Sequence, residues 1–130
     1  METIAGNGGE GFEDGQGNNT KFFLPNSIRL HVITNSLLVA DTYNHVIRSI
    51  DLNNNNEVTT VAGTPESYGY VDGANNVAQF KFPYYLAVKN DTGDIYVAEN
   101  QRIRLISGGF TTTFAGDAGV AGLVNGIKLS

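Results

Sequence analysis

The sequence predicts an all-β protein that consists of two similar units, each a four-stranded antiparallel sheet. Three observations support this fold class. The tetrapeptide T-x-A-G occurs three times and ends at Gly6, Gly63 and Gly116. The stretch LLVADTYNHVIRSID (residues 37–51) returns in a shorter form as IYVAENQRIRLIS (residues 95–107). The chain also contains 16 glycines among many β-branched and aromatic residues, which is typical of short strands joined by tight turns.

The two related stretches each predict a β-hairpin. V-A-D (39–41) and V-A-E (97–99) lie 58 residues apart, whereas I-R (47–48) and I-R (103–104) lie only 56 apart. The second copy has therefore lost two residues inside its loop. Because side chains along a strand alternate with period two, losing two loop residues keeps every side chain on its original face.

This reasoning predicts the register of both hairpins. Val39 is expected opposite Arg48, around a four-residue loop at positions 42–45. Val97 is expected opposite Arg104, around the two-residue loop 100–101.

Four strands are expected in each unit. The runs LLVA and IYVA are almost continuously apolar, which predicts burial on both faces. Four short strands in a repeat of about 40–50 residues or slightly more are typical of a propeller blade. The expected strands cover residues 27–33, 37–40, 46–51 and 58–62 in the first unit, and 84–88, 94–98, 102–106 and 110–115 in the second.

These motifs together resemble the NHL-repeat family of β-propellers. The resemblance rests on the hairpin V-A-D-x-x-N-x-x-I-R, which contains Asp41, Asn44 and Arg48, on the outer strand T-x-A-G, and on the connection G-x-x-D-G … A-x-F-x-x-P. It covers almost the whole chain. The second unit departs from the pattern because Glu99 replaces the aspartate and the hairpin is shorter, and Asn125 stands for the aspartate of a third connection.

The resemblance implies a closed ring, usually of six blades, of which this chain would hold two four-stranded blades and partial flanking repeats. The expected boundaries are a trailing outer strand at 1–6, a first repeat at 7–63, a second repeat at 64–116 and the start of a third connection at 117–130. Two blades alone would expose apolar faces. We therefore expect further NHL blades of the same polypeptide, or identical copies, as partners.

Two acidic residues occupy matching D-G pairs, Asp14 and Asp72. One interpretation makes them calcium ligands, and the other makes them turn residues that bond nearby backbone N–H groups. The spacing of a calcium-binding EF-hand loop is absent, so we favour turn chemistry.

The hairpins contain two acid–arginine pairs, Asp41 with Arg48 and Glu99 with Arg104. They could be recognition charges on the surface. Alternatively, they could be structural groups in which the acid caps the hairpin turn, which holds Asn44 or Asn100, and the arginine contacts that turn or a neighbouring blade. We favour the structural role, and exposed pairs of this kind contribute only about 0–1 kcal/mol.

Little in the sequence indicates catalysis or a metal site. One branch of the family is an amidating lyase with histidine-bound zinc, but this chain has only His31 and His45 and no cysteine. We therefore expect no cofactor, no metal and no catalytic residues. Aromatic residues flank the two prolines and could form a ligand platform, although packing between blades is the favoured interpretation. They are Phe22, Phe23, Phe80, Phe82, Tyr84 and Tyr85.

The formal charge of −5 argues against a nucleic-acid surface, and no apolar run approaches the ~18 residues of a membrane span. The sequons at Asn18 and Asn90 would allow N-glycosylation if the protein is secreted. The favoured function is a non-catalytic interaction or scaffold module that binds a protein or glycan partner. The alternative is part of an amidating-lyase-like enzyme whose site lies in other blades, and RNA binding is a third hypothesis that the acidity disfavours.

Overall fold

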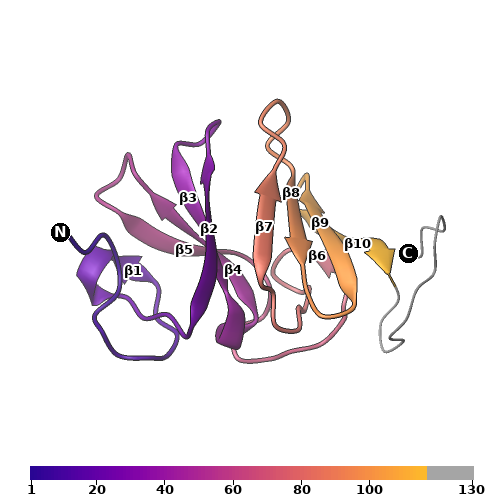
Figure 1. Cartoon of the computed structure of the whole chain (residues 1–130), viewed down its shortest axis with the longest axis horizontal. Helices are drawn as coiled ribbons and strands as arrows, with labels where there is room; N and C mark the ends of the chain where they lie inside the picture. Colours follow the sequence, from indigo (N-terminus) through magenta and orange to yellow (C-terminus); the bar gives the residue numbers. More distant parts are fainter. Residues whose placement is uncertain (117–130) are drawn as a thin grey trace.

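Residues 1–116 are described in a computed structural model of the chain. They form two antiparallel sheets of five strands each, which lie side by side and fan apart toward one end (Figure 1). The order is β1-β5-β4-β3-β2 in the first sheet and β6-β10-β9-β8-β7 in the second. The innermost strands β2 and β7 are neighbours at the centre of the molecule (Figure 1).

The first sheet contains β1 (Gly15–Gln16), β2 (Pro25–His31), β3 (Ser36–Asp41), β4 (Val46–Asp51) and β5 (Glu57–Ala62). The second contains β6 (Gly73–Ala74), β7 (Tyr85–Val88), β8 (Ile95–Ala98), β9 (Arg102–Ser107) and β10 (Phe110–Gly116). Two short 3₁₀ turns, η1 (Gly17–Asn19) and η2 (Thr42–Asn44), complete the described elements.

The all-β prediction is confirmed, but the prediction of four strands in each sheet is wrong. The D-G connection adds a two-residue outermost strand, so that Gly15 pairs with Val58 and Gly73 pairs with Thr111. Both glycines have a φ of +147°, which residues with a side chain rarely adopt. A strand of two residues leaves no periodic pattern in the sequence, and for this reason it was not expected.

The expected outer strand near the N-terminus is also not formed. Residues 3–6 have no strand partner, since neither sheet includes them. The expected third connection, with Asn125, lies outside the described residues.

The predicted hairpin registers are confirmed. Val39 lies opposite Arg48 and Val97 lies opposite Arg104. In the first hairpin the four-residue loop forms η2 and ends at His45, whose φ is +59°. Alternation then gives each sheet two faces, which we name the Val39 and Ala40 faces of the first sheet and the Val97 and Ala98 faces of the second.

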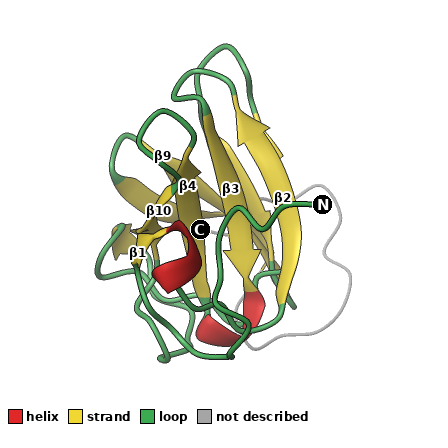
Figure 2. Ribbon diagram, turned by 90° about the vertical axis from the view of Figure 1, so that its left-hand side faces the viewer, coloured by secondary structure: helices red, strands yellow, loops and turns green. Residues whose placement is uncertain are grey.

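The main hydrophobic core lies between the two sheets, where the Ala40 face packs on the Val97 face. Leu38, Ala40 and Ile47 contribute from the first sheet. The members from the second sheet are Leu86, Ile95, Val97 and Ile106. We call this interface the seam. The Val39 face is turned away from it and is crossed by the N-terminal segment (Figure 2).

Candidate functional site

The two hairpin arginines are buried structural residues. Arg48 is fully buried, and its Nη1 donates to Asp41 Oδ2 at 2.6 Å. Its Nη2 donates to Asp14 Oδ1 at 2.8 Å, and Asp14 in turn accepts from Thr60 Oγ1 at 2.9 Å. The rings of Phe12 and Phe22 lie on the guanidinium, with centroids 4.5 and 4.6 Å from its carbon.

The second sheet repeats this arrangement. Arg104 is fully buried and donates to Glu99 Oε1 at 2.9 Å and to Asp72 Oδ1 at 2.7 Å. Thr113 Oγ1 donates to Asp72, as Thr60 does to Asp14. We call these groups the first and second arginine clusters. The aspartate of the D-G pair, the arginine of the I-R pair and the threonine of T-x-A-G therefore contact one another in each sheet. Their repetition in the same order along the sequence could have indicated this contact.

The clusters correct the expectation that these ion pairs are exposed. The side chains of Arg48 and Asp41 are both 0% exposed, as are those of Arg104 and Glu99. The pairs are buried because the connection before each sheet folds over its arginine and supplies backbone acceptors, including Lys21 and Gln79. Asp14 and Asp72 also do more than close a turn, because each bonds the arginine of its own sheet.

The acid of each hairpin accepts a backbone N–H from the proline stretch that precedes the hairpin in the chain. Phe23 N donates to Asp41 Oδ1 at 2.8 Å, and Lys81 N donates to Glu99 Oε2 at 2.7 Å. Burial raises the pKa of Glu99, and the bonds from Lys81 and the charge of Arg104 oppose that rise.

The predicted hairpin asparagines differ in their surroundings. Asn44 is buried and donates to Asp41 Oδ2 at 2.8 Å and to Gly11 O at 2.7 Å. Asn100 is exposed at the tip of the shorter hairpin. The sequon residues Asn18 and Asn90 are also exposed, in η1 and in the turn before β8.

The longer hairpin loop, residues 42–45, bridges the seam with polar contacts, and we call it the seam loop. Thr42 Oγ1 donates to Pro83 O at 2.6 Å, and Phe82 N donates to His45 Nδ1 at 3.1 Å. Glu66 N also donates to the backbone oxygen of Asn44 at 3.1 Å. Burial and the charge of Lys81 lower the pKa of His45, which favours the neutral imidazole that accepts the bond from Phe82.

A group of aromatic side chains surrounds the seam loop. Tyr43 contacts Phe23 and Phe82, with ring centroids 5.2 and 5.3 Å apart. His45 contacts Phe82 at 4.7 Å and Tyr68 at 5.2 Å. These five residues and Lys81, whose Nζ lies 5.5 Å from the Tyr68 ring centroid, form the seam cluster.

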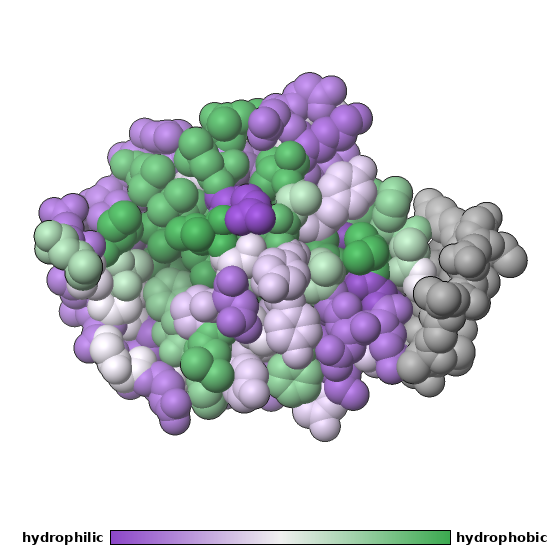
Figure 3. All heavy atoms as spheres, viewed as in Figure 1, coloured by the Kyte–Doolittle hydropathy of each residue, from purple (hydrophilic) through white to green (hydrophobic). Residues whose placement is uncertain are grey.

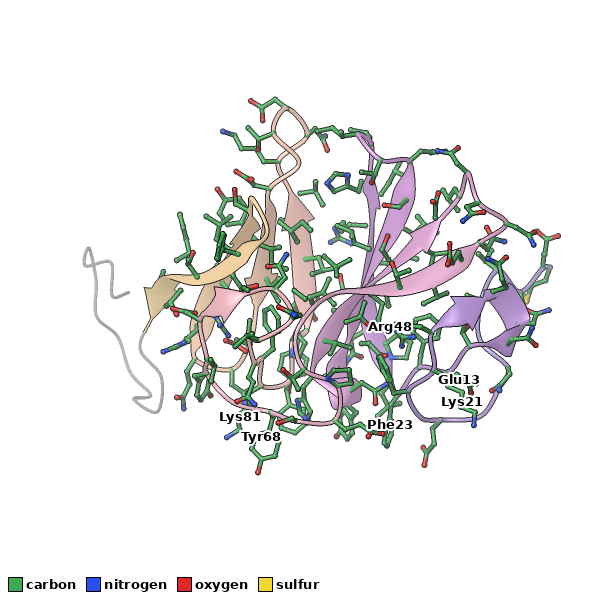
Figure 4. All side chains as sticks on the ribbon, turned by 180° about the vertical axis from the view of Figure 1, so that it is seen from behind. Glu13, Lys21, Phe23, Arg48, Tyr68 and Lys81 are labelled. Atoms are coloured by element: carbon green, nitrogen blue, oxygen red, sulfur yellow. The ribbon has the colours of Figure 1, made fainter. Side chains whose placement is uncertain are left out.

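The seam cluster combines exposed rings with a fixed backbone. Tyr43 is 46% exposed and Tyr68 is 60% exposed. Lys81 and Phe82 are held from both sheets, because Glu99 accepts one backbone N–H and His45 accepts the other. Lys81 and Tyr68 lie together at the loop end of the molecule (Figure 4). Within residues 1–116, no carboxylate lies within 4.0 Å of Lys81 Nζ.

The aromatic residues that flank the prolines have separate roles. Phe80 is fully buried and Phe22 lies on Arg48, whereas Phe23 and Phe82 belong to the seam cluster. The expected role, packing between the two sheets, therefore applies to only some of these aromatic residues. Sequence reasoning missed Tyr43 and Tyr68, although Tyr43 stands in the hairpin loop that is two residues shorter in the second unit.

Nothing in residues 1–116 brings the two histidines together. His31 lies at the far end of β2, where its Nε2 is 3.0 Å from Gly93 O. No group of three or more histidine, aspartate or glutamate side chains suited to a metal ion occurs in the described part of the chain. The same residues contain no helix that is long and apolar enough to cross a membrane.

No family model matches the chain. The chain is 27% identical over 119 residues to Protein SUPPRESSOR OF QUENCHING 1, chloroplastic, of Arabidopsis thaliana, a match that covers 88% of this chain and 11% of that protein. The chain therefore spans about a ninth of the length of this curated relative.

Three solved bacterial structures resemble the fold, and the chain spans about a quarter of each. A protein of unknown function from Bacteroides thetaiotaomicron matches with a TM-score of 0.69 and 21% identity, over 76% of this chain and 24% of that one. An auxiliary nutrient binding protein from Bacteroides ovatus matches with a TM-score of 0.61 and 22% identity, over 72% and 25%. Another from B. thetaiotaomicron has a TM-score of 0.56 and 24% identity, over 68% and 25%. At this identity the likeness shows the fold alone, a β-sheet architecture compatible with propeller-like blades.

Proposed function

We propose that the chain is a non-catalytic binding module of NHL-type propeller blades, and that its seam cluster binds a glycan that carries carboxylate groups. The observation that carries the proposal is the pair of exposed rings, Tyr43 and Tyr68, beside Lys81 on a backbone fixed from both sheets. The repeated hairpin, outer strand and connection support the NHL assignment. The neighbours described as auxiliary nutrient binding proteins agree with a binding role.

The chemistry of the cluster suits a sugar. The C–H face of a pyranose ring packs on a tyrosine ring, while the phenolic hydroxyl bonds a sugar hydroxyl. Because Lys81 has no carboxylate partner within 4.0 Å in residues 1–116, a sugar carboxylate would give it one. A fixed backbone lowers the entropic cost of binding. None of the described residues supplies an observation that favours the alternative, part of an amidating-lyase-like enzyme.

The test is a calorimetric titration of the full chain with oligogalacturonate, an acidic glycan, and with cellohexaose, a neutral one. We expect oligogalacturonate to bind, and Tyr68→Ala and Lys81→Met each to weaken binding by roughly tenfold, the equivalent of about 1.4 kcal/mol. Phe110→Ala is the matched control, because Phe110 is an exposed ring in β10 and outside the cluster. That variant should bind like the unchanged chain.

Two results would overturn the proposal. One is the absence of heat with both glycans at concentrations where the chain is folded. The other is binding that Tyr68→Ala and Lys81→Met leave unchanged. Stronger binding of cellohexaose than of oligogalacturonate would refute the acidic ligand while keeping a glycan.

A further inference from the structure

The T-x-A-G segments occupy equivalent positions on the two sheets. At the end of β5, Gly63 N donates to Asn75 O at 2.9 Å, beside the second sheet. Near the N-terminus, Gly6 N donates to Gly17 O at 3.1 Å, beside the first sheet. The two glycines have φ angles of +104° and +102°. Residues 3–6 therefore lie on the first sheet where the end of an outer strand lies on the second, although no strand pairs with them.

The N-terminal segment covers the Val39 face only in part. A groove of about 480 Å³ remains beside it, lined by Ile28, Leu37, Val39 and Ile50 together with Ile4. Hydrophobic surface gathers over this side of the molecule (Figure 3).

A comparison with the equivalent position in the second sheet shows that the Val39 face lacks a packing partner. Ile28 is 51% exposed, whereas Leu86, 58 residues later on the Val97 face, is 3% exposed because the first sheet covers it. An apolar side chain left in water forgoes about 25 cal/mol for every Å² that a partner would bury.

Within residues 1–116, no segment covers the Ala98 face at the other end of the molecule. Ile103 is 37% exposed, whereas its counterpart Ile47 on the Ala40 face is fully buried in the seam. Tyr85 on the same face is 65% exposed. The third T-x-A-G segment ends β10 beside this face, and its Gly116 has a φ of +94°, close to the values at Gly6 and Gly63.

We infer that copies of the chain associate head to tail, with the Ala98 face of one copy on the Val39 face of the next. The seam inside the chain provides the geometry, because there the Ala40 face packs on the Val97 face through equivalent residues. Residues 113–116 of one copy would then occupy the position that residues 3–6 occupy in the other. The N-terminal segment therefore competes with the second copy for the groove and weakens association.

This contact is heterologous, since it joins two different faces, so it produces a closed ring or an open chain of copies. The formal charge of −5 on each copy opposes the contact at low ionic strength. Salt screens this repulsion, so association should strengthen as salt is added.

The experiment is sedimentation velocity of the full chain over a range of concentrations, compared with a variant that lacks residues 2–6. We expect both to associate, and the shortened chain to do so at a roughly tenfold lower concentration because no segment must leave the groove. Ile28→Asp and Ile103→Asp each alter one of the two faces. Each variant alone should stay a monomer.

Mixing the two variants distinguishes this contact from nonspecific adhesion. Each variant keeps one intact face, so the mixture should form a one-to-one dimer that cannot grow further. Val32→Asp is the matched control, because Val32 is exposed and does not line the groove, and it should associate like the unchanged chain. The inference is overturned if the shortened chain stays monomeric, if either single variant still associates, or if the mixture gives no dimer.

Discussion

Arg48 in the first hairpin and Arg104 in the second occupy equivalent positions, but Arg48 has more hydrogen bonds and ring contacts. Every guanidinium nitrogen of Arg48 has a hydrogen-bond acceptor, and two aromatic rings enclose the group. Arg104 lies against one ring, that of Phe80, and its Nε has no partner among the described residues. The difference arises in the connection before each sheet, because Asp14 accepts from Arg48 Nε and Phe12 lies on Arg48, whereas Tyr70, the counterpart of Phe12, lies on Arg102.

The two additional residues of the first hairpin loop do two things. They provide Asn44, which braces Asp41, and they carry Thr42 and His45 across the seam to the second sheet. In the shorter hairpin the acid keeps only two contacts, one with the arginine and one with the backbone N–H of Lys81. Glu99, one methylene longer than an aspartate, makes both of them. The cluster is thus a property of the repeat, while the polar bridge between sheets is a property of the longer loop.

The largest expected effect comes from removing the arginines. Arg48→Met should lower the free energy of unfolding by about 3–5 kcal/mol, because Asp41 would be buried without its partner. Arg104→Met should cost less, since Arg104 has fewer contacts. Urea unfolding followed by circular dichroism, at a low protein concentration that limits association, measures both.

Arg29→Met is the control for this experiment, because Arg29 is exposed on β2, and its effect should stay within about 0.5 kcal/mol. A loss for Arg48→Met no larger than that of the control would show that the cluster does not stabilise the fold.

Replacing the hairpin acid should also cost more stability in the first sheet, at Asp41, than in the second, at Glu99. Asp41→Asn should cost about 2–3 kcal/mol, because Asp41 accepts bonds from Phe23, Asn44 and Arg48. Glu99→Gln should cost only about 1 kcal/mol, because burial already raises the pKa of Glu99 and so disfavours its charged form. Urea unfolding at pH 7 compares the two, and an equal or reversed order would contradict this account.

A substitution in the seam loop should have a smaller effect on stability. Thr42→Val keeps the side-chain shape but removes the bond to Pro83 O and the acceptor for Asn26 Nδ2, so it should cost about 1–2 kcal/mol. Thr59→Val on the exposed side of β5 is the control and should be nearly neutral. If both variants lose the same stability in thermal melts, the bridge to Pro83 contributes nothing.

The smallest expected effect is a pH dependence at His45. Because burial and Lys81 lower its folded pKa below 6.5, the unfolded chain binds the proton more readily. The contribution of His45 to stability is therefore complete above pH 6.5 and falls as the pH drops from 6.5 toward the folded pKa. His45→Asn should remove this part of the dependence, and asparagine tolerates the φ of +59°. An unchanged slope between pH 7 and pH 5 in unfolding experiments would assign it to other groups.

Periodicity in the sequence determined the pairing of each hairpin. A strand alternates with period two, so Val39 opposite Arg48 and Val97 opposite Arg104 follow from the chain itself, and so does the tolerance for a loop two residues shorter. These are contacts between neighbours in the chain, and local patterns are sufficient to specify them.

Only the tertiary structure decided the surroundings of these residues. The segments that bury Arg48 lie some 27 to 36 residues before it, and their position depends on the path of the connection, which no local period encodes. The seam cluster likewise joins Tyr43 and Tyr68 through ring contacts with His45 and Phe82 that form only when two sheets pack. The solvent exposure of a side chain depends on how the sheets pack. The sequence alone could therefore specify which residues pair between neighbouring strands, but not which of them remain exposed to solvent.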